Sequence, residues 1–235
     1  IFSNYYIKKK KFQDFAVENA NIFFGYHDKI NLIENKILFH ENIKENFYVG
    51  YFHKNKKIKL KKTQLCSWQL GSQLQWIDKN KIIFNGYEKN YPKSMIYNIK
   101  KKSLIKTFDH LIFNLCNQKR KFVSLNFKKI FIYRKGYGYD LKNFVNNNDL
   151  NDDLKVIDIK SGKILNSINK IALKKFINNS GDNYYFNHAT FSPSGKFLVF
   201  FLVKNIGKER KINFIKFNLR NNSLKLIKKI KKISH

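Results

Sequence analysis

The sequence predicts an all-β fold made of repeated four-stranded units. Apolar residues come in short runs rich in Ile, Val, Phe and Tyr. Turns rich in Asn, Asp, Ser, Gly and Lys separate these runs. The same order of runs and turns recurs along the chain. Because the apolar runs are short and interrupted, we do not expect a helical domain.

The clearest unit covers residues 68–108. It contains four apolar runs, with a polar turn between the first two and another between the last two. The runs are 75–77, 81–84, 95–99 and 104–108. Runs of this length and composition are typical of β-strands joined as hairpins. We therefore expect a four-stranded antiparallel sheet here.

The same order recurs in three further units, over residues 23–62, 111–167 and 186–230. The unit at 111–167 is the loosest, because a polar insertion around residues 146–153 interrupts it. The last unit contains the turn Ser192-Pro193-Ser194-Gly195 between two apolar runs.

Stacking of such units buries apolar faces that one unit cannot bury alone. Four units at spacings of roughly 40–60 residues match the blades of a β-propeller. A β-sandwich with similar strand density is the alternative. Four blades is the low end for a closed ring, and 233–235 reads as the start of a further blade. We expect residues 1–235 to form a single propeller domain that is an incomplete ring or a fragment.

The formal net charge of +31 raises the question of nucleic acid. The cations are almost all Lys, and the four arginines are Arg120, Arg134, Arg210 and Arg220. Asn, Ile and Phe are abundant while Ala and Pro are rare, which indicates drift towards A/T-rich codons. Since Arg is the better ligand for phosphate and base edges, we do not expect nucleic acid as the partner. The electrostatic field of this positive charge still attracts anions, and salt weakens that attraction.

Cys66 and Cys116 lie far apart and form no C-x-x-C pair, so neither a metal site nor a disulfide framework is expected. No long uncharged apolar run predicts a membrane span. No signal-like segment follows Ile1, which favours a cytoplasmic protein. Because the sequence does not start with Met, a leader could precede it, and the compartment stays open.

In a four-stranded antiparallel unit, the first and third turns lie at one end, and the middle loop and the inter-unit connections lie at the other. The chemically richer segments fall at this second end, which should surround the mouth of the channel. Its candidate ligand-binding residues are His27, Gln69, Gln73, Arg134, Tyr137, Tyr139 and His188. Gln73 and His188 occupy equivalent repeat positions.

Each candidate also has a structural explanation. A single His where a strand begins is commonly a hydrogen-bonded cap, and Tyr137 and Tyr139 could pack over the channel rim. Gly136 and Gly138 form a G-x-G without a following helix pattern, which indicates positive φ rather than phosphate binding. The sequence has no G-x-S-x-G or H-E-x-x-H motif, and its Asp residues lack the spacing of a calcium loop.

Residues 187–196 resemble the F-S-P-D-G-K signature of TolB-type, WD40-like bacterial β-propellers. The preceding Asn-His, residues 71–76 and the terminal Ser-His are similar to oligogalacturonate lyase and its uncharacterised relatives. This resemblance implies a divalent metal such as manganese, held by His and Gln side chains in the channel. By carry-over, His188 and His235 are the candidate metal ligands. The later Gln/His cluster of that family has no counterpart here.

The leading functional expectation is a ligand-binding propeller that takes an anionic saccharide at the channel mouth. One alternative is a metal-dependent, oligogalacturonate-lyase-like polysaccharide lyase acting by β-elimination, with its catalytic residues unassigned. Another alternative is a scaffold that binds other proteins.

Overall fold

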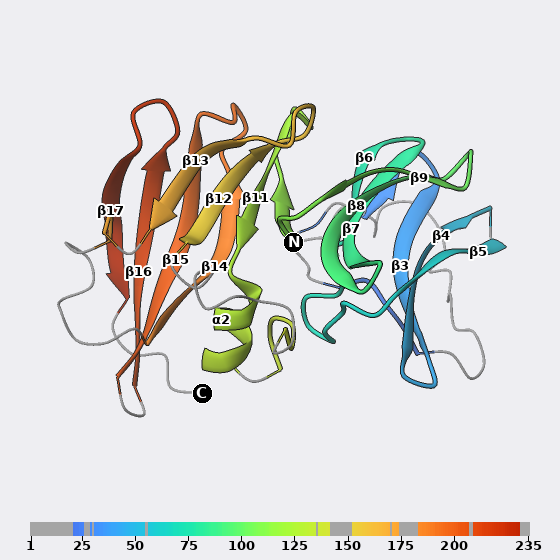
Figure 1. The fold of residues 1–235 in the computed structure, drawn as a ribbon, viewed down its shortest axis with the longest axis horizontal. Helices are drawn as coiled ribbons and strands as arrows, with labels where there is room; N and C mark the ends of the chain where they lie inside the picture. The colour runs from blue at the N-terminus through green and yellow to red at the C-terminus, as the bar shows by residue number, and fades with distance from the viewer. Residues whose placement is uncertain are drawn as a thin grey trace, which may run out of the picture.

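The computed structural model describes residues 21–25, 29, 31–54, 56–134, 136–141, 152–169, 171–173, 183–206 and 209–230. In these ranges the chain forms four antiparallel β-sheets and a short helix (Figure 1). The predicted all-β fold is confirmed.

Strands follow one another in chain order within each sheet, except that β2 lies off this path in the first sheet. The first sheet contains β1 (Asn21–Phe23), β2 (Leu32–Ile33), β3 (Lys36–Ile43), β4 (Asn46–His53) and β5 (Lys56–Thr63), and β1 and β2 both pair with β3. The second contains β6 (Gln75–Asp78), β7 (Lys81–Glu88), β8 (Tyr91–Asn98) and β9 (Ser103–Phe108). The third contains β10 (Ile112–Leu115), β11 (Lys121–Leu125), β12 (Asp152–Asp158) and β13 (Ile164–Asn169). The fourth contains β14 (Tyr184–Phe191), β15 (Phe197–Ile206), β16 (Glu209–Asn218) and β17 (Ser223–Ile230).

The core consists of three apolar layers, one between each pair of consecutive sheets. On β7, Ile82 and Phe84 pack with Leu38 of the first sheet, whereas Ile83 packs with Phe122 of the third sheet. Successive strand residues point to opposite faces, so a sheet buried on both faces needs apolar residues at consecutive positions. The run 82–84 meets this requirement, and all three of its side chains are fully buried.

The layer between the third and fourth sheets also receives helix α2 (Phe127–Tyr133), which packs against β14 near its lower end in Figure 1. The Asn126 side chain caps the helix by accepting the N–H of Lys129 at 2.9 Å. The sequence analysis expected a polar insertion in this unit and not a helix. Most of that insertion around 146–153 lies outside the described residues, since residues 142–151 are not described.

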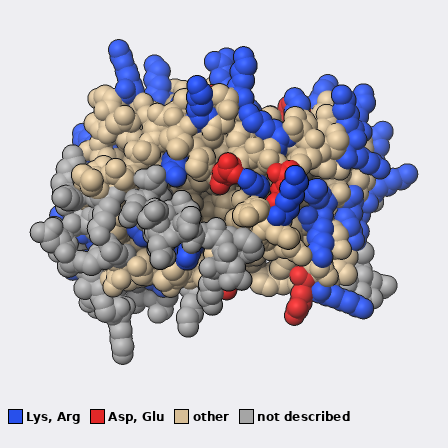
Figure 2. Space-filling model, in the orientation of Figure 1, with Lys and Arg blue, Asp and Glu red and all other residues tan. Residues whose placement is uncertain are grey.

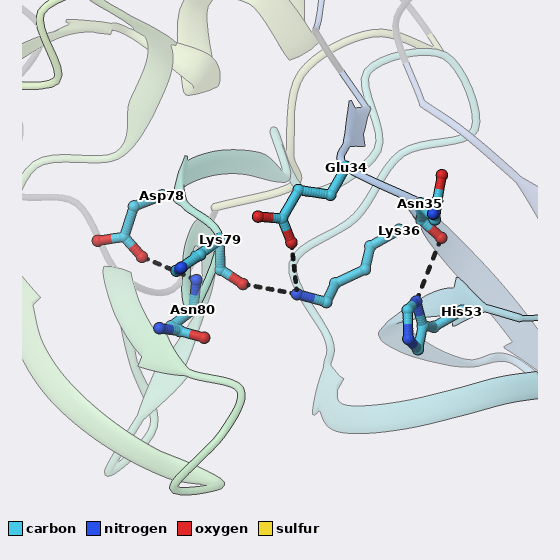
Figure 3. Close-up of polar contacts among 7 residues, drawn as sticks. All are labelled: Glu34, Asn35, Lys36, His53, Asp78, Lys79 and Asn80. Carbon is cyan, nitrogen blue, oxygen red and sulfur yellow. Dashed lines mark hydrogen bonds and ion pairs between the residues drawn. The ribbon is translucent and has the colours of Figure 1, made fainter.

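Turns of neighbouring sheets meet at one end of the molecule. Lys36 Nζ donates to the Lys79 carbonyl at 3.1 Å and pairs with Glu34 at 3.6 Å (Figure 3). Between the third and fourth sheets, Gln118 Nε2 donates to the Pro193 carbonyl at 2.9 Å. The first turns of neighbouring sheets are therefore in contact, as expected for propeller blades arranged side by side.

The described sheets do not close a ring, because the first and fourth lie at opposite ends of the row (Figure 1). The predicted incomplete β-propeller is thus confirmed, while the suggested further blade at 233–235 lies outside the described residues. Lys and Arg side chains project along much of the edge of the visible face and far outnumber the acidic ones (Figure 2). In the described part of the chain, no helix is long and apolar enough to cross a membrane.

Candidate ligand site at the loop end of the sheets

A cavity of about 300 Å³ lies between two segments that are distant in sequence, 64–68 and 136–140. Trp68, Tyr137 and Tyr139 line it, together with Tyr87. The first segment connects the first sheet to the second, and the other follows α2. The cavity therefore lies at the end of the molecule where the sequence analysis expected a ligand, and we name it the aromatic cavity.

Tyr137 lines this cavity and stacks with Arg134, which is outside the cavity lining. Arg134 ends helix α2, and its guanidinium carbon lies 3.8 Å from the centroid of the Tyr137 ring. The Tyr137 N–H donates to the Arg134 carbonyl at 3.1 Å, which folds the loop back on the helix. This stacking holds a permanent positive charge over an aromatic face.

Tyr139 lines the same cavity but is mainly a structural residue. It is 2% exposed, and its ring stacks on Phe127 with the centroids 4.5 Å apart. Its hydroxyl donates to the Gly71 carbonyl at 3.1 Å and accepts from Asn85 Nδ2 at 3.2 Å. The side chain therefore ties the loop after α2 to the segment that leads into β6.

Asp140 supplies the acidic group of the cavity lining. Burial and, to a smaller extent, the charge of Asp140 raise the pKa of the Tyr87 hydroxyl. Burial also raises the pKa of the Cys66 thiol, which keeps it protonated. Cys66 and Cys116 are both free thiols. The cavity thus offers one carboxylate, neutral hydroxyls and a neutral thiol.

Trp68 and Gln69 are exposed on a tight turn in which the backbones of Ser67 and Gly71 bond each other. Trp68 is 55% exposed and contacts the rings of Phe23 and Phe47, with centroids 5.0 and 5.8 Å away. Gln69 is next to the cavity in sequence but does not line it.

Gln73 and His188 share a backbone feature that supports their predicted equivalence. Each lies in a β-bulge next to the second strand of its sheet, and both have positive φ, 57° and 52°. Non-glycine residues rarely adopt this conformation, and such strain clusters at functional sites. The Gln73 side chain is buried, and neither its amide nitrogen nor its amide oxygen has a hydrogen-bond partner among the described residues.

His188 is half-buried, with its ring edge-on to Phe201 at 5.2 Å between centroids. The two other predicted histidines, His27 and His235, lie outside the described residues. Within the described ranges, no group of three or more His, Cys, Asp or Glu side chains is placed to hold a metal ion.

The sequence analysis missed His40, which is fully buried between the first and second sheets. Its Nε2 accepts the backbone N–H of Ser72 at 3.0 Å and lies 2.9 Å from the Ser72 hydroxyl oxygen. Burial lowers the pKa of its imidazole from 6.5 to about 3. The repeat pattern could have identified it, because N-K-I-L-F-H at 35–40 aligns with N-K-I-I-F-N at 80–85. This alignment places His40 at the repeat position that Asn85 occupies in the next unit.

A second cavity of about 300 Å³ lies at the N-terminal end of α2, where Phe127 and Lys128 line it. Lys93 and Lys155 contribute further positive charge, and Lys93 pairs with Asp109. None of the predicted ligand residues lines this cavity.

No known family profile matches the chain, and no curated protein matches it in sequence. Among solved structures it is similar to TolB from Acinetobacter baumannii, with 9% identity over 82% of this chain and 40% of that one and a TM-score of 0.47. It is similar to an oligogalacturonate lyase in complex with manganese, with 10% identity over 94% of this chain and 70% of that one and a TM-score of 0.46. It is also similar to the β-propeller domain of the Trilobed protease from Pyrococcus furiosus, with 10% identity over 90% of this chain and 58% of that one and a TM-score of 0.47.

The chain therefore spans 40% of the length of TolB. Likeness at these identities concerns the fold alone, and the fold assignment rests on the four sheets and their order. In fold, the chain resembles TolB-like β-propellers at low sequence identity.

Proposed function

We propose that this propeller binds an anionic saccharide in the aromatic cavity. The observation that carries the proposal is that Tyr137, which lines the cavity, stacks with the Arg134 guanidinium. Flat aromatic faces pack against the apolar face of a pyranose ring, and a guanidinium binds carboxylate in a bidentate manner. Trp68, more than half exposed, provides the more accessible flat face, because Tyr137 is only 8% exposed.

The charges of Asp140, in the cavity lining, and of Arg134, behind Tyr137, set an orientation for the ligand. Asp140 repels a carboxylate and accepts hydrogen bonds from hydroxyl groups, whereas Arg134 attracts a carboxylate. A uronate ring would therefore place its carboxylate towards Arg134 and its hydroxyls towards Asp140. The cavity volume lies at the small end of the roughly 300–1,000 Å³ range of ligand pockets, which suits the end of an oligosaccharide. The excess of lysine strengthens the attraction at low salt.

Calorimetry with galacturonate oligomers and with neutral galactose oligomers, at low and at high salt, tests the proposal. We expect the charged oligomer to bind more tightly and to lose affinity as salt rises. Tyr137→Ala should weaken binding at least about tenfold, since it removes the stacking face and the support for Arg134. Tyr91→Ala is the matched control, because Tyr91 is an exposed tyrosine that lines the other cavity.

Absence of saccharide binding at low salt would remove the proposal. Equal losses of saccharide affinity in the Tyr137 and Tyr91 variants would show that the ligand is attracted by the overall positive charge and does not bind in this cavity. Nucleic-acid binding instead predicts a steep salt dependence that saccharide does not compete with.

A further inference from the structure

A smaller cavity lies where the inner strands of the second, third and fourth sheets meet. Its volume is about 100 Å³, and β6, β10 and β14 each contribute one polar side chain, Gln75, Asn114 and Thr190. These three residues occupy the same position in their sheets, since they pair with Ile83, Val123 and Val199 on the neighbouring strands. The repeat therefore brings these three polar side chains together at one point.

Hydrogen bonds link these side chains from one inner strand to the next. Gln75 Oε1 accepts the backbone N–H of Leu115 at 2.9 Å. Asn114 Nδ2 donates to Thr190 Oγ1 at 3.4 Å. Gln75 Nε2 also donates to the carbonyls of Gln73 and Phe113, at 3.0 and 3.5 Å, which uses both of its hydrogens. The Asn114 amide and the Thr190 hydroxyl each keep a further donor for a ligand.

Two lysines also line the cavity. Lys29 is 7% exposed, and its Nζ lies 4.9 Å from the centroid of the Phe113 ring. Lys119 is half-buried on the turn between β10 and β11, where its φ is 56°. Burial lowers the pKa of Lys119, so a bound anion would offset a desolvation cost that the lysine now bears. The described residues that line the cavity include no Asp or Glu.

We propose that this cavity binds a small oxyanion, a carboxylate or a phosphate group, between Lys29, Lys119 and the polar side chains of the inner strands. Lysine ammonium groups supply the charge, while the Asn114 amide and the Thr190 hydroxyl supply directed donors. The volume equals that of roughly three water molecules at about 30 Å³ each. It therefore suits a single oxyanion group and excludes a sugar ring.

This site is independent of the proposed saccharide site. Lys119 lies on a first turn of its sheet, at the end of the molecule opposite the middle loops that form the aromatic cavity. Either site could exist without the other, and the experiment below does not depend on saccharide binding.

Trp76 lines the cavity and serves as a built-in reporter. The chain has two tryptophans, so Trp68→Phe leaves Trp76 as the single one. In this background, fluorescence titration with inorganic phosphate at constant ionic strength should show saturable binding of one ion per chain, and calorimetry should confirm the stoichiometry. Titration with acetate provides the second arm. Tighter binding of phosphate assigns a phosphate group, and tighter binding of acetate assigns a carboxylate.

Lys119→Gln should weaken binding at least about tenfold, because it removes one of two charges in a partly buried site. Lys100→Gln is the matched control, since it removes the same charge from an exposed turn and should change affinity by less than about twofold. Thr190→Val keeps the charge and the shape and should weaken binding several-fold.

Equal effects of Lys119→Gln and Lys100→Gln would overturn the proposal, because they would show a general response to net charge. Non-saturable titrations with both anions would overturn it as well. Tyr137→Ala should leave phosphate binding unchanged, so the failure of one proposed site can be told from the failure of the other.

Discussion

His40 and Asn85 occupy the same position in consecutive sheets, and each accepts a backbone N–H from the segment that begins the next sheet. His40 Nε2 accepts from Ser72 at 3.0 Å, and Asn85 Oδ1 accepts from Ile112 at 2.9 Å. The repeat thus uses two different side chains for one task. The task requires a neutral acceptor, because a protonated imidazole has no lone pair to offer.

The neutral state of His40 should make stability depend on pH. Burial lowers the pKa of its imidazole from 6.5 in the unfolded chain to about 3. As the pH falls, the histidine of the unfolded state therefore binds a proton before that of the folded state. The contribution of neutral His40 to the free energy of unfolding is fully present above about pH 6.5 and is lost progressively towards about pH 3. At pH 5 the loss should be about 2 kcal/mol. Urea unfolding at pH 7.5 and pH 5.0 measures it.

His40→Asn should remove most of this pH dependence, because asparagine keeps an acceptor and does not titrate. His53→Asn, on β4, is the control and should leave the slope between the two pH values unchanged. If the His40 variant kept the pH dependence of the wild-type unfolding free energy, that dependence could not be assigned to His40.

Asn85 should be the more costly of the two to replace. It is fully buried, donates to the Ile112 carbonyl at 2.8 Å and accepts from the Ser94 hydroxyl at 2.9 Å. Asn85→Leu removes these bonds from a fully buried site, so the free energy of unfolding should fall by about 3 kcal/mol or more. Asn98→Ala removes one bond at an exposed turn and should cost less than about 1 kcal/mol. Similar losses in both variants would contradict the expectation.

Gln73 and Gln75 form a matched pair with opposite expectations. The buried Gln73 amide has no hydrogen-bond partner among the described residues, whereas the Gln75 amide bonds Leu115 and the Gln73 carbonyl. Gln73→Met should therefore be neutral or stabilise by about 1 kcal/mol, and Gln75→Met should destabilise by about 1–3 kcal/mol. Thermal and urea unfolding measure both. If Gln73→Met costs as much as Gln75→Met, a partner satisfies the Gln73 amide.

Gly136 and Gly138 lie in one loop and allow the stability cost of backbone strain to be compared with that of a steric clash. Their φ angles are 83° and 71°. A Cβ at Gly136 would meet nothing within 4 Å, but one at Gly138 would lie 2.5 Å from the Phe127 carbonyl oxygen. Gly136→Ala should cost about 1 kcal/mol, and Gly138→Ala clearly more, with loss of the packing of Tyr137 and Tyr139. Equal costs, measured by urea unfolding, would contradict this account.

The sequence by itself determined the strands and the end of each sheet at which the loops gather. Strand alternation and turn residues are local signals, and antiparallel order then assigns each connection to an end. It also indicated that Gln73 and His188 are equivalent, because repeat register is a property of the sequence. It did not reveal helix α2, since a helix of seven residues depends on packing rather than on its own propensity.

Only the tertiary structure decided which of these residues meet. It joined 64–68 to 136–140 around one cavity, gave Tyr139 a place in the core as well as in the cavity lining, and left Gln69 outside that lining. It also brought Gln75, Asn114 and Thr190 to a single point. Such contacts depend on how apolar faces pack between sheets, and that packing joins segments too distant in the chain for any local pattern to specify.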